Sequence, residues 1–486
     1  MNNRVVKAGI GYTIGNVLLQ GIGVLTLPLF TRLLTTSEYG QYSVFMSYAA
    51  ILLTLVGCAL HTSVRSANLT FPGQLDAYVS SVTLIYCFNL VVLLAFSALA
   101  SPSVCKFLDL TNSQMALLSV YCFSTSMMNL YNTRLSVEYK VKRYLVLSII
   151  SSIGSVLLAV VLMLTVFNSD RLLGRLLGQT GAVVLVSIVA MCSLYKAARP
   201  IPSKEFYQFG LKYGGPLIAH GVSQTLLAQF DRIMINTIVG STQAGIYSFA
   251  GSVKTILNVI QNALNTVWAT WFFDEMAVGH SENIKRKGKE FGLLVGLLAI
   301  GVLGISPEVI KVLGAKAYWE AQYVAIPMVL DSYILFIYGI VVQAEYYTKK
   351  TTYVLIGTIV AAVINIITNY VFINLYGYLA AAYTTLFSYV CYLIMHLIIA
   401  RRLVGFHIIA IKQLIIQSLM VFLFGGLCLM TLEMWYFRWL LTILSIVIFA
   451  AFLIKYISED QGVPAKEYVK CLVQNSIIMI RKHYRK

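Results

Sequence analysis

Apolar residues follow one another along this chain in runs of about 20, the length at which a helix crosses the hydrocarbon core of a bilayer. Short polar breaks separate the runs. We therefore predict fourteen membrane-spanning helices and an all-α fold. Their approximate ranges are 8–34, 40–64, 77–101, 112–135, 144–167, 172–195, 207–239, 243–272, 290–306, 321–345, 353–373, 378–400, 412–432 and 435–457.

The composition agrees with a polytopic membrane protein. Of the 486 residues, 59% are hydrophobic and 11% are charged, whereas a soluble domain is roughly half apolar and about a quarter charged. The run 8–34 is too long for the apolar core of a signal peptide, and no cleavage motif follows it. The eight cysteines include no CxxC pair, so we expect neither a metal site, a disulfide nor a bound cofactor.

The basic residues predict how the helices are oriented. Of the 36 Lys and Arg residues, 27 fall on the side of the predicted membrane that holds both termini and seven on the other, while Arg232 and Lys254 lie within spans. The positive-inside rule then puts both termini in the cytoplasm. Attraction to anionic lipid headgroups accounts for most of the formal charge of +17, so we expect membrane lipids and no nucleic acid as partners.

Two short sequences occur twice, at matching places. "SEYGQYS" (37–43) is echoed by "TQAGIYS" (242–248) at the predicted outer turns, and "KVKRYLVL" (140–147) by "KKTTYVLI" (349–356) at inner turns. An alternative is that Gly, Tyr and Ser simply make a good interfacial turn. We favour an internal duplication, in which two parallel halves surround a central cavity as in many transporters.

The duplication predicts the domain organisation. Residues 1–200 and 201–405 would each form a six-helix bundle, related by pseudo-symmetry. Residues 406–458 would add two transmembrane helices, and 459–486 a basic cytoplasmic tail.

Polar side chains within the spans carry the candidate chemistry, because a charge in the bilayer is costly unless it faces water or a partner. Four of them are spaced 4, 7 and 11 residues apart and so share one helical face: Lys254, Asn258, Gln261 and Asn265. Other spans carry further polar positions: His61, His220, Gln224, Asp231, Asp331, Tyr338, Glu345, Asn365 and Asn369. We predict that such stripes line a wet, mildly cationic cavity.

This cavity suits an anionic, polar cargo. Arg134, Arg232 and Lys254 would bind phosphate, and the histidines and amides would line the cavity beside sugar hydroxyls. Asp231 and Asp331 are candidates for coupling transport to a proton or Na⁺ gradient. Structural alternatives stay open: polar side chains also join membrane helices, Lys254 also fits a buried ion pair, and Arg134 also fits a snorkelling anchor.

Four longer stretches resemble one family. They are "LPLFTRLLTTSEYGQYS" (27–43), "LLGRLLGQTGA" (172–182), "FDRIMINTIVGSTQAGIYS" (230–248) and "INLYGYLAAAYTT" (373–385). Their order and spacing resemble the polysaccharide transport family, the Wzx-type O-antigen flippases of the multidrug/oligosaccharidyl-lipid/polysaccharide exporter superfamily. Arg32, the pair Asp231–Arg232 and Lys254 match the family pattern.

The resemblance implies a MATE-like or MurJ-like fold and a role in lipopolysaccharide or related surface polysaccharide synthesis. The protein would move undecaprenyl-diphosphate-linked oligosaccharide repeat units across the bacterial inner membrane by alternating access, in exchange for H⁺ or Na⁺. A polysaccharide polymerase and a chain-length regulator are the implied protein partners.

Two other functions are weaker alternatives. A multidrug exporter of the same superfamily usually carries cations and needs an acidic cavity, whereas here Arg232 and Lys254 balance Asp231 and Asp331. A membrane polysaccharide polymerase needs a large outer loop with charged catalytic residues, and the longest candidate, between 306 and 321, is short. Because the sequence contains no nucleophile elbow or phosphate-binding loop, we predict that the protein is not an enzyme.

Overall fold

A computed structural model describes residues 11, 12, 15, 18–405, 408–460, 464 and 467. The N-terminal basic residues Arg4 and Lys7 and nearly all of the predicted tail 459–486 lie outside the described residues. Throughout the described part, the regular secondary structure is helical. The prediction of an all-α protein is therefore confirmed.

Ten helices in the described part of the chain are long and apolar enough to cross a membrane, which confirms a polytopic membrane protein. The shorter apolar helix Leu18–Leu33 covers part of the first predicted span. Helices α7 (Asn112–Val137), α10 (Lys204–Ile238) and α11 (Ser241–Val278) are also long but are not among the ten. Each of these three carries many polar side chains. The number fourteen stays a prediction.

The chain divides into two compact units, each drawn from several segments. Unit 1 comprises the described residues of Met1–Phe249, Lys311–Trp319 and Thr358–Thr385. Besides α7, α10 and the start of α11, its helices are α2 (Leu27–Leu33), α3 (Thr36–Val56), α4 (Leu60–Thr70), α5 (Leu75–Leu99), α6 (Pro102–Leu108), α8 (Val141–Leu164), α9 (Arg171–Ala197), most of α15 (Thr351–Tyr376) and the start of α16 (Leu379–Val404).

Unit 2 comprises the described residues of Ala250–Ile310, Glu320–Gly357 and Leu386–Lys486. Besides the remaining parts of α11, α15 and α16, it contains α12 (Ser281–Leu313), the end of the 3₁₀ helix η1 (Lys316–Ala321), α13 (Gln322–Val341), α14 (Gln343–Tyr347), α17 (Ile411–Met430) and α18 (Trp435–Asp460). The units follow contacts in space, so the predicted domains 1–200, 201–405 and 406–458 stay a prediction.

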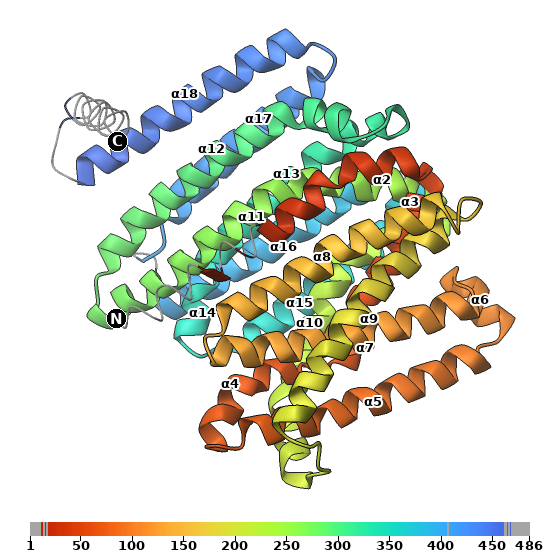
Figure 1. Ribbon diagram of the computed structural model, residues 1–486. Helices are drawn as coiled ribbons and strands as arrows, with labels where there is room; N and C mark the ends of the chain where they lie inside the picture. The colour runs from red at the N-terminus through yellow and green to blue at the C-terminus, as the bar shows by residue number, and fades with distance from the viewer. Residues whose placement is uncertain are drawn as a thin grey trace, which may run out of the picture. The chain divides into compact units, whose positions relative to one another are not determined.

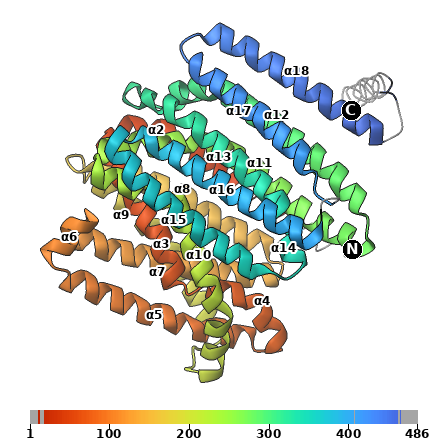
Figure 2. The same cartoon turned by 180° about the vertical axis from the view of Figure 1, so that it is seen from behind.

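Small residues let helices approach closely within each unit. In unit 1, α8 and α9 lie side by side (Figure 1), and a Cβ added to Gly178 would lie 2.2 Å from the Cα of Ala159. In unit 2, α17 lies beside α12 (Figure 2), and Gly292 of α12 faces Gln417 of α17. The amide nitrogen of Gln417 donates to the carbonyl oxygen of Lys289 at 3.2 Å. Such contacts are typical of membrane helices, which cannot rely on the hydrophobic effect to associate.

The predicted span 40–64 lies within one candidate membrane span, Thr36–Thr70, but the helix is interrupted inside it. α3 ends at Val56, and α4 begins at Leu60. Between them Cys58 and Ala59 have φ values of 44° and 49°, in the left-handed region that residues other than glycine seldom adopt. The carbonyl oxygen of Cys58 lies 2.3 Å from where a Cβ on Gly214 would stand, so α10 passes close to this break.

The two copies of the outer repeat lie in the first turns of α3 and α11 rather than in loops. Thr35 caps α3, because its hydroxyl accepts a hydrogen bond from the backbone N–H of Glu38, whose carboxylate accepts from the N–H of Thr35. Helix α3 therefore begins at Thr36, earlier than the predicted start at residue 40.

The two copies pack against each other within unit 1. A Cβ on Gly40 would lie 1.8 Å from the carbonyl oxygen of Ser241, and a Cβ on Gly245 would lie 2.0 Å from that of Thr36. Gly245 comes 205 residues after Gly40, and Ser241 comes 205 residues after Thr36. Each glycine therefore packs against the same position of the other copy. Such a reciprocal contact is typical of an interface with two-fold symmetry. The hydroxyl oxygens of Ser37 and Ser241 lie 2.7 Å apart beside it. Each glycine is needed because the partner's backbone occupies the place of a side chain.

The inner turns also match each other. Tyr139 and Lys349 have φ values of 57° and 59°. The N–H of Lys140 donates to the carbonyl oxygen of Leu135 at 2.9 Å, and the N–H of Lys350 donates to that of Glu345 at 2.8 Å. Both turns thus end a helix with the same 6→1 hydrogen bond. The echo "KVKRYLVL" and "KKTTYVLI" begins at or next to these turns.

Candidate functional site

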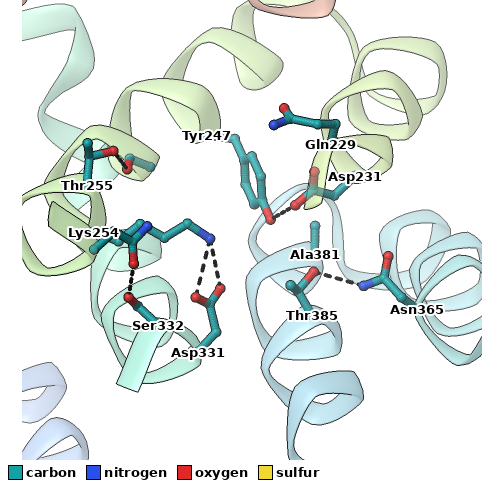
Figure 3. Close-up of polar contacts among 12 residues, drawn as sticks. Gln229, Asp231, Tyr247, Lys254, Thr255, Asp331, Ser332, Asn365, Ala381 and Thr385 are labelled. Atoms are coloured by element: carbon teal, nitrogen blue, oxygen red, sulfur yellow. Dashed lines mark hydrogen bonds and ion pairs between the residues drawn. The ribbon is translucent and has the colours of Figure 1, made fainter. Parts of the chain in front are cut away.

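The polar face predicted on α11 packs against α13 in unit 2. The ammonium of Lys254 lies 3.3 Å and 3.2 Å from the two carboxylate oxygens of Asp331 (Figure 3). One residue further along α13, the hydroxyl of Ser332 donates to the side-chain oxygens of Asn258, in a short contact, and Gln261, at 3.0 Å. Three residues of the predicted face of α11 thus contact two consecutive residues of α13. They are Lys254, Asn258 and Gln261, and their partners are Asp331 and Ser332.

The same face continues toward the next turns of α13. Gly339 leaves room for Asn265, whose side-chain oxygen lies 2.6 Å from where a Cβ on Gly339 would stand. The indole N–H of Trp268 then donates to the carbonyl oxygen of Ile340 at 3.2 Å. All four predicted residues of the α11 stripe therefore lie along one neighbouring helix.

The electrostatics of this stripe centre on the pair Lys254–Asp331. The side chain of Asp331 is 1% exposed and that of Lys254 is 21% exposed. Because the two charges cancel, the positive charge predicted from Lys254 is balanced within unit 2 by one of the two predicted ion-coupling residues. Such a pair stays together as long as water is excluded, and it separates only if each member gains another partner.

Three polar residues of α13 and α14, spaced seven apart, all have polar partners. Asp331 has Lys254, the hydroxyl of Tyr392 donates to that of Tyr338 at 2.8 Å, and Nδ1 of His396 lies 2.5 Å from Oε1 of Glu345. Sequence reasoning singled out Asp331, Tyr338 and Glu345 but missed both partners on α16. The spacing of four between Tyr392 and His396, which puts both on one helical face, is the signal that could have found them.

In unit 1, Asp231 lies at the centre of a second group. Its side chain accepts a short hydrogen bond from the hydroxyl of Tyr247, the tyrosine of the second outer repeat (Figure 3). It accepts another from the backbone N–H of Arg232 at 2.9 Å. The guanidinium of Arg232 donates to the side chain of Gln229 in a short contact, and its Nε is buried without a partner among the described residues. Asp231 is buried and Arg232 is half-buried.

Buried amides join α15 to α16 in the same unit. The Asn365 amide donates to the hydroxyl of Thr385 at 3.0 Å (Figure 3). The Asn369 amide donates to the side-chain oxygen of Asn365 at 3.1 Å. The hydroxyl of Thr384 donates to Asn369 in turn. These contacts fit the interpretation of Asn365 and Asn369 as residues that hold helices together.

Residues 5–276, more than half of the chain, match the family described as "Polysaccharide biosynthesis protein". The chain belongs to this family. This member of the polysaccharide biosynthesis family is also 23% identical to the "Lsg locus putative protein 1" of Haemophilus influenzae over 284 residues, which cover 56% of this chain and 67% of that protein. It is 22% identical over 366 residues to an "Uncharacterized membrane protein" of the same organism, covering 71% and 85%. The resemblance seen in the sequence is confirmed.

Solved structures share the fold of this family member. The lipid II flippase MurJ in an inward closed conformation matches with a TM-score of 0.72 at 14% identity, over 92% of this chain and 99% of MurJ. An inward-facing multidrug resistance MATE family transporter matches with a TM-score of 0.62 at 13% identity, over 79% and 94%. A transporter of the same superfamily from Pyrococcus furiosus reaches 0.55 at 14% identity, over 88% and 96%. These likenesses confirm a MurJ-like and MATE-like fold.

Other residues predicted for the site lie apart from these groups in unit 1 of the polysaccharide biosynthesis protein. Arg134 is buried and its Nε lies 2.6 Å from Asp76, with Glu138 3.5 Å from the same guanidinium. Two predicted residues, Arg32 and Gln224, are exposed, and two, His61 and His220, are half-buried. The roles of these five residues in binding stay predictions.

Sequence reasoning also missed Arg175. Its guanidinium lies 3.6 Å from the ring centre of Phe30 and 4.6 Å from that of Tyr42, and it donates to the hydroxyl of Tyr42 at 3.1 Å. Tyr42 is the tyrosine of the first outer repeat. Each of the two repeated tyrosines thus contacts a buried charged residue, Arg175 for Tyr42 and Asp231 for Tyr247.

Proposed function

We propose that this protein is a flippase that moves a polyprenyl-diphosphate-linked oligosaccharide across the bacterial inner membrane during synthesis of O antigen or a related surface polysaccharide. One observation carries the proposal: a member of a polysaccharide biosynthesis family has the multi-pass helical fold of a lipid flippase. Lipid-linked saccharides combine a long apolar tail with a polar, anionic head, and a membrane-embedded protein with polar side chains inside its spans suits both parts.

The proposed route is alternating access, in which the saccharide and diphosphate pass through the protein while the polyprenyl tail stays in the lipid. Arg232 in unit 1 and Lys254 in unit 2 are each proposed, separately, to contact phosphate during transport, since cationic side chains bind phosphate strongly. Lys254 would have to release Asp331 to bind a phosphate. The exchange would leave Asp331 ready to take up a proton or Na⁺, which would contribute to coupling transport to an ion gradient.

The proposed topology puts both termini in the cytoplasm, on the strength of the distribution of Lys and Arg. Its Lys349–Lys350 turn then faces the cytoplasm, and the contact between Gly40 and Gly245 lies on the periplasmic side. A polymerase and a chain-length regulator would receive the flipped repeat units. With this role the protein acts as a transporter and not as an enzyme.

Deleting the gene in its native host tests the proposal. We expect loss of the surface polysaccharide and accumulation of lipid-linked repeat units on the cytoplasmic face. Wild-type protein should restore the polysaccharide fully, and Lys254→Ala and Arg232→Ala should restore it weakly at equal membrane abundance. Gel analysis of the polysaccharide and extraction of the lipid-linked saccharides measure both effects.

A matched control is Lys285→Ala, which removes a cation whose only described ion pair is with the exposed Glu282 at 3.9 Å. It should restore the polysaccharide completely. Unchanged surface polysaccharide in the deletion strain, together with increased sensitivity to cationic drugs, would instead favour a multidrug exporter, a function suggested by the shared MATE fold.

A further inference from the structure

We propose that Glu345 and His396 form a proton-binding site in unit 2, and that the proton it takes up and releases couples transport to the proton gradient. The coupling role rests on the proposed transport function, whereas the binding of a proton does not. Neither residue belongs to the groups around Lys254 or Asp231. The ligand is a proton from water, and no other reactant is needed.

The pair is enclosed by protein. Glu345 lies on α14 and His396 on α16, and both side chains are 0% exposed. Nδ1 of the imidazole lies 2.5 Å from Oε1 of the carboxyl group, so the two groups are in direct hydrogen-bond contact. The other two polar atoms, Oε2 of Glu345 and Nε2 of His396, are buried and have no partner among the described residues. Buried polar atoms seldom lack a hydrogen-bond partner without a functional reason.

Aromatic rings surround the pair. The ring centre of His396 lies 5.0 Å from that of Tyr338 and 4.6 Å from that of Tyr392. Among the described residues, the titratable groups near the pair are the phenols of Tyr338, Tyr392 and Tyr346. On α15, Gly357 adds no side chain, and a Cβ there would stand 2.4 Å from Nε2 of His396. The described neighbours of the pair thus include two tyrosine rings and a glycine.

The number of protons on the pair decides its charge. With one proton between carboxylate and imidazole, the pair carries no net charge. Removing this proton leaves an isolated carboxylate, and adding a second leaves an isolated cation, and either is costly in a site closed to water. The enclosed pair therefore holds one proton. It can release this proton only when the helices α14 and α16 admit water or a cation to the site.

This dependence on water makes the pair suitable for coupling. Glu345 precedes the basic turn Lys349–Lys350 by about one turn of helix, so a small opening at that turn would connect the pair to the solvent on that side. With the site open toward that side, the proton would leave as H₃O⁺ to that solvent, and coupling requires that the pair take up its next proton from water on the opposite side in the alternate conformation.

Infrared difference spectra of the purified full-length protein in detergent, recorded between about pH 5 and about pH 8, test proton binding without any cargo. We expect carboxyl and imidazole bands that disappear together in Glu345→Gln and in His396→Gln. The chain offers a matched control, because His280 and Glu275 form a similar contact at 3.2 Å in which the histidine is exposed. Glu275→Gln and His280→Gln should leave those bands in place. Bands that persist in both site variants would overturn the proposal.

Proteoliposomes test the coupling, with the lipid-linked saccharides extracted from the deletion strain as the probe. We expect a proton gradient to accelerate translocation by the wild type and by the two control variants. Glu345→Gln and His396→Gln should translocate only at the rate seen without a gradient, and the exchanged pair Glu345→His with His396→Glu should recover part of the acceleration. Site variants that respond to the gradient like the wild type would overturn the coupling role.

The failures of the two proposals can be told apart. If the wild type translocates nothing, the proposed function fails, while the infrared bands still decide whether the pair binds a proton. If the wild type translocates the probe, but substitution of Glu345 or His396 changes neither the infrared bands nor the response to the proton gradient, only the proposed proton site fails. Where a site variant does not fold, as judged by gel filtration, the exchanged pair provides the same test.

Discussion

Linking the two outer repeats by a disulfide is expected to stop translocation completely. The hydroxyl oxygens of Ser37 and Ser241 lie 2.7 Å apart, so cysteines at both positions would be close enough to form a bond after small adjustments. In the proposed alternating access, the ends of α3 and α11 that carry the repeats would separate, and a covalent bond between them would prevent this. The measurement is rescue of surface polysaccharide in the deletion strain by Ser37→Cys with Ser241→Cys, before and after adding a reductant. The eight native cysteines must first be replaced.

Each single cysteine variant is the control, and both should remain active under oxidising conditions. Full activity of the oxidised double variant, with the cross-link shown to be complete, would mean that this contact does not open during transport. Gly40→Ala and Gly245→Ala provide a second test, because each new Cβ would meet the partner's backbone. They should lower the yield of the cross-link, whereas Gly301→Ala, with nothing within 4 Å of its added Cβ, should not.

The sequence predicted the helices well because lipid imposes a simple rule on them. Every backbone polar group in the bilayer must be paired within its own segment, so a long apolar run is almost necessarily a helix. Helix ends obey other rules. α12 spans Ser281–Leu313, well beyond the predicted 290–306, because a helix continues into the polar region until a cap or a turn stops it. The break after Val56 was missed because Cys58 and Ala59 adopt left-handed conformations without being glycines.

The repeat was visible in the sequence, but its physical cause was not. Spacing shows that Gly40 and Gly245 correspond, and a tight turn would explain a glycine equally well. Only the reciprocal packing against Ser241 and Thr36 reveals that these glycines are required for contact between two helices. A single sequence does not show whether two equivalent copies of a repeat contact each other in the folded protein.

The candidate site shows the same limit. Periodicity correctly placed Lys254, Asn258 and Gln261 on one face of α11, because side chains on a helix repeat regularly. It did not name Asp331 as the partner of Lys254, since the two are 77 residues apart. His396 was missed for a related reason: a single histidine in an apolar span is unremarkable until its carboxylate partner is known. Partners between helices depend on packing, which spacing along one helix does not determine.

Removing the two members of the Lys254–Asp331 pair one at a time should have unequal effects on stability. In Lys254→Ala the carboxylate of Asp331, 1% exposed, loses its cation, and breaking a buried pair in this way costs about 3–5 kcal/mol. In Asp331→Ala the longer and partly exposed side chain of Lys254 can turn toward water, so the loss should be smaller. Reversible unfolding of the purified variants in detergent measures both free energies.

The double variant Lys254→Met with Asp331→Leu separates stability from function. Replacing both charges by apolar side chains removes the unpaired carboxylate, so much of the free energy of unfolding lost in Lys254→Ala should return. Translocation should not return, because the proposed phosphate contact and the proposed ion-coupling residue are both gone. Rescue of surface polysaccharide by the double variant would show that the pair serves only to join α11 to α13. Equal losses of stability in the two single variants would show that Lys254 is held as firmly as Asp331, and then the lysine could not leave its partner to bind a phosphate.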